Sequence, residues 1–176
     1  MTETKSTSRA HSRNWLGIGI IIASIVISVL LRIFVLGVYV VPTSSMLDTI
    51  RIGDVVAGVK LDKSIDAGDI VTFRSPQSGD LLVKRVVAVG GQTVDYKDGY
   101  LYVDGARQDQ SYVNGQSFAP DSLELPYTVP EGSVWVMGDN RENSKDSRFF
   151  GPVRLQNVEC KVTTRVFPFD KIGALS

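Results

Sequence analysis

The chain has 176 residues and a formal net charge of zero, with 19 basic and 19 acidic side chains. This length suits one globular domain with an appendage. No basic stripe with interleaved aromatic residues appears, so the chain is a poor fit to a nucleic-acid-binding protein. Cys160 is the only cysteine, which excludes an intrachain disulfide and a thiolate metal cage.

The only histidine, His11, lies in the polar N-terminal arm. Its position excludes Ser-His-Asp chemistry, Cys-His chemistry and His-rich metal sites from the rest of the chain. Any general base there must be a lysine or a carboxylate. We therefore expect neither a metal nor a cofactor.

Residues 15–32 are predicted to form a single transmembrane helix. Residues 15–31 read WLGIGIIIASIVISVLL and lie between Arg13 and Arg32 without a charge. At about 1.5 Å of rise per residue they cover roughly 25 Å, and the apolar residues from Ile33 onward are expected to extend this reach. A cleaved secretory signal is the alternative, but no Ala-x-Ala site follows the run.

The basic arm, residues 1–14, sets the expected topology. Lys5, Arg9 and Arg13 precede the span. The positive-inside tendency then places the N-terminus in the cytoplasm of the cell. Residues 33–176 are expected to form an extracytoplasmic β-rich domain, anchored to the lipid bilayer of the cell membrane.

The fold class predicted for this domain is mainly β, as a sandwich or a partly closed barrel. Apolar residues do not recur at helical spacing over a dozen positions; short β-rich runs between turn signals recur instead. Residues 106–130 are expected to be a long irregular connection. Turns are expected at residues 97–99 and 104–105, and strands at residues 54–60, 69–73, 81–89, 92–96, 100–103 and 133–137.

Two adjacent serines, Ser44 and Ser45, follow Pro42 in the stretch VPTSSM. Pro42 restricts the preceding residue to extended geometry, and small polar residues after it suit a sharp exit from a strand. A serine there can be exposed with its backbone N–H free for an oxyanion. Ser-Ser pairs are also common in ordinary loops, so this stretch alone does not identify a nucleophile.

Two charges, Lys84 and Arg85, interrupt the apolar strand expected at residues 81–89. On strand pattern alone, Lys84 reaches water and Arg85 forms a salt bridge. The functional alternative is a lysine that burial keeps neutral, which requires roughly 3 to 5 kcal/mol of destabilisation of the ammonium. A neutral amine beside a serine can accept its proton.

The tract GDNRENSKDSRFFG, residues 138–151, is dense in polar side chains. A solvated loop is the plain interpretation. The alternative is an ordered loop in which carboxylate–guanidinium pairs form among Asp139, Arg141, Asp146 and Arg148 and hold Ser144 or Asn143 beside a buried amine. Calcium binding is disfavoured because arginines interleave the carboxylates.

Together, and behind a single span, these clusters resemble the bacterial type I signal peptidases, which are membrane-anchored Ser-Lys endopeptidases. The resemblance covers the anchor through about Gly173. It rests on Pro42-Thr43-Ser44-Ser45-Met46 with Thr49, Gly53-Asp54, Gly68-Asp69-Ile70-Val71, Lys84-Arg85 with Gly91 and Val94, and the polar tract at 138–151. It implies the family's mostly antiparallel β domain and removal of signal peptides from exported preproteins after Ala-x-Ala sites.

Carried over position by position, the resemblance makes Ser45 the nucleophile and Lys84 the general base. It assigns Thr43 to the oxyanion hole and Ser144 to orienting the lysine. Asp139, Arg141, Asp146 and Arg148 become supports of the site. The walls of the substrate pocket are then expected to be Tyr39, Val41, Pro42, Met46, Leu82 and Val83.

Three residues depart from the family pattern. Asp48 stands where the family usually has proline, and Gly90 and Gln92 replace proline and aspartate around Gly91. We expect altered kinetics or stability at most. The region 100–130 lacks the large insertion of some Gram-negative members, which indicates a compact Gram-positive-like form.

Two other functions remain alternatives. A self-cleaving repressor-type protease shares the Ser-Lys pair but would carry another domain where the span lies. A membrane-anchored β module that binds partners without catalysis is the alternative from a different class.

Overall fold

The computed structural model describes residues 7–60, 62, 64–108, 111–120 and 123–175. The chain divides into two compact units, Met1–Val35 and Leu36–Ser176. The first contains the N-terminal helix and the second is the β domain.

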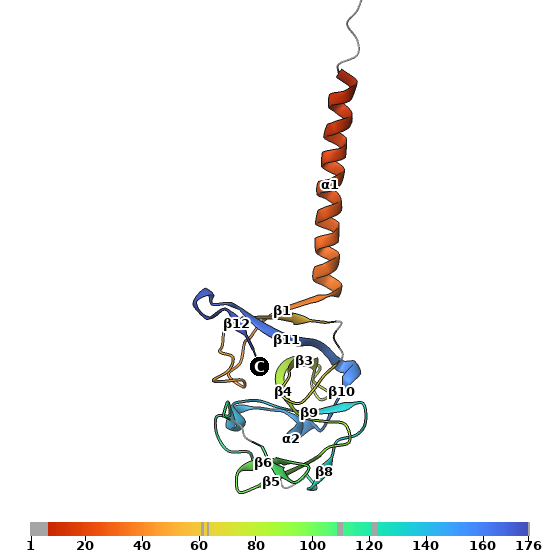
Figure 1. Ribbon diagram of the computed structural model, residues 1–176. Helices are drawn as coiled ribbons and strands as arrows, with labels where there is room; N and C mark the ends of the chain where they lie inside the picture. The colour runs from red at the N-terminus through yellow and green to blue at the C-terminus, as the bar shows by residue number, and fades with distance from the viewer. Residues whose placement is uncertain (1–6, 61, 63, 109–110, 121–122, 176) are drawn as a thin grey trace, which may run out of the picture. The chain divides into compact units, whose positions relative to one another are not determined.

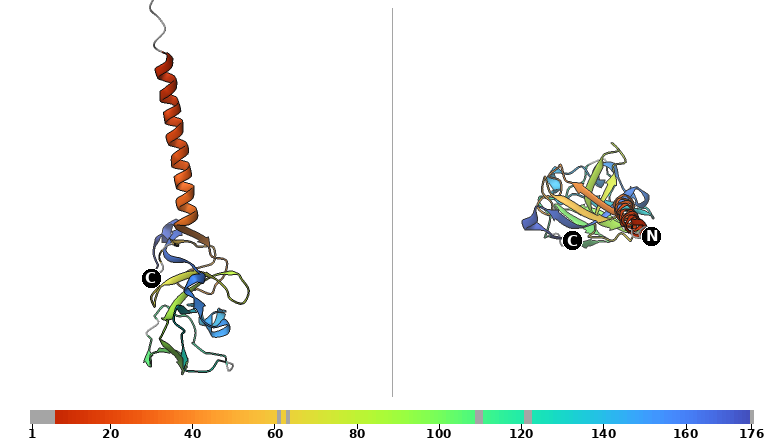
Figure 2. Two further views of the ribbon diagram at one scale, coloured as in Figure 1. Left: turned by 90° about the vertical axis from the view of Figure 1, so that its right-hand side faces the viewer. Right: turned by 90° about the horizontal axis from the view of Figure 1, so that it is seen from above.

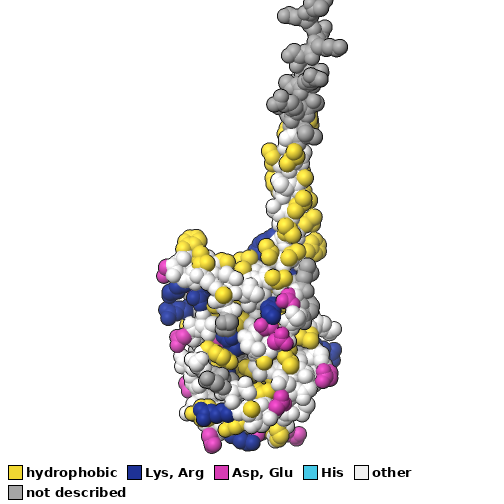
Figure 3. Space-filling model, viewed as in Figure 1, with side chains coloured by type: hydrophobic (Ala, Val, Ile, Leu, Met, Phe, Trp, Pro, Cys, Tyr) yellow, Lys and Arg dark blue, Asp and Glu magenta, His cyan; other side chains and the backbone are white. Residues whose placement is uncertain are grey.

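Helix α1 spans Thr7–Phe34 and contains the predicted transmembrane residues 15–32. It also includes part of the predicted arm; residues 1–6, with Lys5, lie outside the described residues. Within α1, Gly17–Phe34 is long and apolar enough to cross a membrane. Hydrophobic side chains are exposed along it (Figure 3). The expected extension of the span from Ile33 onward stops at Phe34, because the chain then becomes a strand.

The larger of two antiparallel sheets has eight strands (Figure 1). Its order is β1-β2-β11-β3-β4-β9-β10, and β12 pairs with β11. The strands span Leu36–Val40 (β1), Val55–Val59 (β2), Ile70–Arg74 (β3), Leu81–Val89 (β4), Ser133–Met137 (β9), Val153–Arg154 (β10), Val158–Phe167 (β11) and Gly173–Ala174 (β12).

The smaller sheet has four strands in the order β7-β6-β5-β8. They span Thr93–Lys97 (β5), Tyr100–Val103 (β6), Ala106–Arg107 (β7) and Tyr127–Thr128 (β8). Asp98 and Gly99, like Asp104 and Gly105, have positive φ, as two-residue hairpin turns require. In Figures 1 and 2 this sheet lies at the end of the β domain away from β1.

Short helical turns complete the β domain, and none is long enough to shield a sheet face. They comprise α2 at Ser147–Phe150 and the 3₁₀ turns η1 at Arg141–Asn143, η2 at Leu155–Asn157 and η3 at Phe169–Lys171. Stability therefore depends on side chains packed between the sheets and loops. Three buried apolar clusters lie within the domain.

The predicted fold class is confirmed, and all six predicted strands are present to within one residue at each end. The other six strands were missed; four of them, β7, β8, β10 and β12, have only two residues each, and β7 and β8 lie in the predicted irregular connection at 106–130. β1 lies in the apolar run that sequence analysis treated as an extension of the membrane span. β11 alternates buried Val158, Cys160 and Val162 with more exposed polar residues, but two irregularities in its pairing with β2 interrupt the pattern.

Candidate active site

The loop after β1 carries Ser45, which is 7 % exposed. Its neighbour Met46 and the later Ile50 are fully buried. Both pack in the apolar cluster that contains Val41, Val56, Ile70 and Val162. Burial of these side chains fixes the adjacent serine at the edge of the core.

Lys84 approaches Ser45 from β4. Its side chain is buried, and its Nζ donates hydrogen bonds to Ser45 Oγ at 2.6 Å and to the carbonyl oxygen of Val83 at 3.1 Å. Burial lowers the pKa of Lys84 from 10.5 to about 8, although the nearby Asp146 and Asp139 carboxylates favour the charged form. The amine is therefore half neutral near pH 8.

Two hydrogen-bond donors, the Thr43 hydroxyl and the Ser45 N–H, lie on the same loop. Thr43 Oγ1 lies 3.4 Å from Ser45 Oγ. Within the described part of the chain, no hydrogen bond occupies the Ser45 N–H. A hydroxyl and a free N–H beside a nucleophile are the donors that a tetrahedral oxyanion needs.

Arg85 points away from Lys84 into an ion pair with Asp139. Its Nε and Nη2 donate to the two carboxylate oxygens at 3.0 and 2.9 Å, and both side chains are almost fully buried. Thr49 Oγ1 donates to the same carboxylate at 2.6 Å. Asp139 therefore joins the strand of the lysine to the loop of the serine.

Asp146 and Arg148 form a second buried ion pair. Arg148 Nε and Nη2 each lie 2.8 Å from a carboxylate oxygen of Asp146, which also accepts from Gly138 N at 3.0 Å. Arg141 Nε and Nη1 donate to the oxygens of Gly138 and Ser117. Residues 138–151 are therefore ordered by buried polar contacts and are not a solvated loop.

Ser144 lies beside the site, but no hydrogen bond joins it to Lys84. Its Oγ is buried and has no hydrogen-bond partner among the described residues. A Cβ placed on Gly138 would lie 2.3 Å from Ser144 Oγ and 2.5 Å from the carbonyl oxygen of Ser45. Only glycine at position 138 permits this close approach.

Two asparagines hold the serine loop: Asn140 was not predicted as a site residue, and Asn143 was expected beside the buried amine and contacts Ser44 instead. Asn140 Nδ2 donates to the Ser44 carbonyl at 3.1 Å, and Asn143 Nδ2 donates to Ser44 Oγ at 2.8 Å. Asn140 N also donates to the Ser45 carbonyl at 3.1 Å. Their place in a polar tract directly after a buried strand was the available signal.

A small cleft of about 50 Å³ adjoins Lys84. Five of the six expected wall residues line it, whereas Met46 is buried in the core and does not. Larger hollows of about 500 Å³ lie elsewhere, and neither Ser45 nor Lys84 lines them. The lining residues are Tyr39, Val40, Val41, Pro42, Thr43, Val56, Thr72, Leu81, Leu82, Val83 and Lys84.

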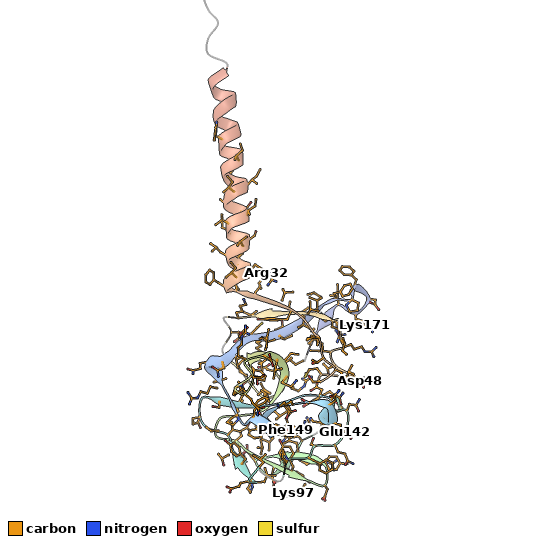
Figure 4. All side chains as sticks on the ribbon, turned by 180° about the vertical axis from the view of Figure 1, so that it is seen from behind. Arg32, Asp48, Lys97, Glu142, Phe149 and Lys171 are labelled. Atoms are coloured by element: carbon orange, nitrogen blue, oxygen red, sulfur yellow. The ribbon has the colours of Figure 1, made fainter. Side chains whose placement is uncertain are left out.

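The residues that depart from the expected pattern have different surroundings. Asp48 is exposed at the surface of the β domain (Figure 4). Gln92 closes the turn after β4, because its side chain accepts from Val89 N at 3.0 Å and donates to Asp104 at 2.9 Å. A Cβ on Gly90 would lie 2.9 Å from Cα of Glu131.

No group of three or more His, Cys, Asp or Glu side chains suited to a metal occurs in the described ranges.

Comparison with known proteins points to one family. The family described as "Signal peptidase, peptidase S26" matches residues 12–167. The chain is 35 % identical to a probable signal peptidase I-1 of Synechocystis, covering 90 % of this chain and 85 % of the relative. It is also 35 % identical to signal peptidase I of Bacillus caldolyticus, covering 81 % and 86 %.

A solved structure shows the same similarity. The crystal structure of a signal peptidase I from Enterococcus faecalis matches with a TM-score of 0.50 and 34 % identity. The match covers 57 % of this chain and 97 % of that one.

Proposed function

The chain belongs to the signal peptidase family, peptidase S26, and from this premise we propose that it removes N-terminal signal peptides from exported preproteins with a Ser45–Lys84 dyad. Family membership makes it a serine peptidase. The proposal adds three features to this: the dyad, the preference for small residues before the cut, and the membrane topology.

The 2.6 Å contact between Lys84 Nζ and Ser45 Oγ carries the proposal. A base must lie within hydrogen-bond reach of the proton that it removes. Burial also gives Lys84 a pKa of about 8. At pH 8 an ordinary lysine with a pKa of about 10.4 would be less than roughly 1 % neutral.

In the acylation step, neutral Lys84 accepts the Ser45 proton while Oγ attacks the scissile carbonyl carbon. The Ser45 N–H and Thr43 Oγ1 donate to the oxyanion that forms. The Lys84 ammonium then gives its proton to the leaving amine, the C–N bond breaks and an acyl-enzyme remains. Lys84, neutral again, accepts a proton from the water that hydrolyses the ester, and returns it to Ser45.

The cleft and the edge of β4 support binding of an extended substrate. β9 pairs with β4 only from Arg85 onward. In the described part of the chain, residues 81–84 therefore pair with β3 on one side and form an edge of the sheet on the other. An extended peptide can add to such an edge through its backbone. A volume of about 50 Å³ suits small side chains, in agreement with an Ala-x-Ala site.

The proposed location is the cell membrane. Gly17–Phe34 is the candidate span, and the basic residues before it favour a cytoplasmic N-terminus. Residues from Leu36 onward then lie on the extracytoplasmic side. The expected partners are signal-peptide-bearing preproteins and the lipid bilayer.

Cleavage of a purified precursor with an Ala-x-Ala site, by the full chain in detergent, tests the proposal. Ser45→Ala and Lys84→Ala should each abolish cleavage while circular dichroism remains that of the wild type. Lys145→Ala, at an exposed lysine of the same tract, is the matched control and should retain full activity. Cleavage by either dyad variant would rule out the dyad, and an inert wild type would favour the binding module.

A further inference from the structure

Thr72, in the wall of the cleft, carries a hydroxyl without a hydrogen bond to any described residue. Thr72 on β3 is 2 % exposed and lines the cleft. Its Oγ1 has no hydrogen-bond partner among the residues that the structure describes. A buried polar atom normally has a partner, so an unpaired one at a ligand-sized hollow points to a group that arrives with the ligand.

The position of Thr72 follows from the register of β3. Ile70 and Thr72 share a face of the strand, and Ile70 belongs to the apolar cluster beneath the serine loop. Thr72 is paired with Val83 on β4, and Val56 also lines the cleft. Val83 and Val56 are apolar and cannot pair with the hydroxyl, and Cys160, which is paired with Thr72 on β11, makes no hydrogen bond with it.

We infer that Thr72 makes the cleft select serine, a small residue with a hydroxyl, at one of the small-residue positions before the cut. This inference rests on the proposed function. The serine Oγ would exchange one hydrogen bond with Thr72 Oγ1, and each hydroxyl can donate or accept. The cleft volume of about 50 Å³ accommodates a few water-sized groups, which fits serine and excludes a large aromatic side chain.

The selectivity arises from the penalty for a missing partner. 2-Aminobutyrate has a methyl group where serine has its hydroxyl, so both fill the cleft equally. With aminobutyrate bound, Thr72 Oγ1 stays buried and unpaired. A site that hydrogen-bonds a substrate hydroxyl discriminates against the analogue that lacks it.

The test uses synthetic precursor peptides and the full chain in detergent. Serine or 2-aminobutyrate is placed singly at position −1 or −3 of an otherwise Ala-x-Ala substrate, and kcat/KM is measured for each. At one position, we expect the ratio of kcat/KM for serine to kcat/KM for aminobutyrate to be roughly five-fold higher in wild type than in Thr72→Val. This factor corresponds to about 1 kcal/mol, the net contribution of one hydrogen bond. Thr72→Ser retains a hydroxyl and should keep most of the wild-type ratio.

Thr128→Val, at an exposed threonine of the smaller sheet, is the matched control and should leave the ratio unchanged. Thr72→Val should also raise Tm without substrate, because it removes the unpaired hydroxyl. Equal ratios for wild type and Thr72→Val at both positions would overturn the inference, whereas failure to cleave any peptide would count against the proposed function instead. An unchanged or lower Tm in Thr72→Val would show that the hydroxyl has a partner in the free protein, and would also overturn it.

Discussion

Arg165 on β11 forms an ion pair with Asp54 at the end of the serine loop, with 2.9 Å between Nε and Oδ2. The same guanidinium donates through Nη2 to the carbonyl oxygen of Thr49. Asp54 in turn accepts from Arg51 N at 3.0 Å. One arginine, outside every motif used in sequence analysis, therefore holds the loop that presents Ser45.

Replacing Arg165 with alanine should lower kcat roughly ten-fold with little change in KM, because a misplaced nucleophile costs rate more than binding. Hydrogen–deuterium exchange of residues 43–54 should accelerate in the same variant. Arg74→Ala is the matched control, because Arg74 also pairs with a β11 residue, Glu159, but at the surface. Equal exchange in the two variants would refute this positioning role.

The rate of cleavage should rise with pH as Lys84 loses its proton. With a pKa of about 8, kcat/KM should increase about ten-fold per pH unit well below pH 8 and level off above it. A plateau reached only above pH 10 would mean that the amine is not desolvated. The measurement is a pH–rate profile between pH 6 and 11.

Lys84→Met should stabilise the protein at neutral pH. The folded-state pKa of Lys84, about 8, lies below its unfolded value of 10.5, so the wild type buries an ammonium below pH 8. Between pH 8 and 10.5 the unfolded chain binds the extra proton, and wild-type stability should rise with pH. The variant should be more stable by up to about 3 kcal/mol at pH 7, with the gap narrowing toward pH 10. Urea unfolding at both pH values measures this difference.

Asp139→Asn should destabilise the β domain by about 3 to 5 kcal/mol, because it leaves the buried Arg85 charge unpaired. Asp95→Asn provides the comparison, since Asp95 pairs with Lys97, whose side chain is 63 % exposed. In this control variant the free energy of unfolding should fall by less than about 1 kcal/mol. Similar losses in the two variants, measured by thermal unfolding, would contradict the importance of burial.

Gly138→Ala should reduce kcat by roughly a hundred-fold, because the added Cβ displaces the serine loop. That Cβ would lie 2.5 Å from the Ser45 carbonyl oxygen. Gly173→Ala meets no atom within 4 Å and should retain full activity. Wild-type kinetics in Gly138→Ala would show that the loop can shift without loss.

Much of the fold could be predicted because local chemistry sets it. Period-two patterns and Asp-Gly turns located six strands, since each signal lies within a few residues. β1 was hidden because a buried strand and the end of a membrane span have the same apolar composition. β11 was missed where irregular pairing breaks its alternation.

By itself, the sequence determined the available chemistry: a single histidine in the arm, an uncharged span, a serine motif, and a lysine inside an apolar strand elsewhere in the chain. Tertiary structure alone decided the partners. It paired Asp139 with Arg85 and not Arg141, buried Met46 in the core and not the cleft wall, brought Arg165 to the serine loop and left Thr72 unpaired. These outcomes depend on strand order and register, which join residues up to 116 positions apart, and no local pattern encodes such pairings.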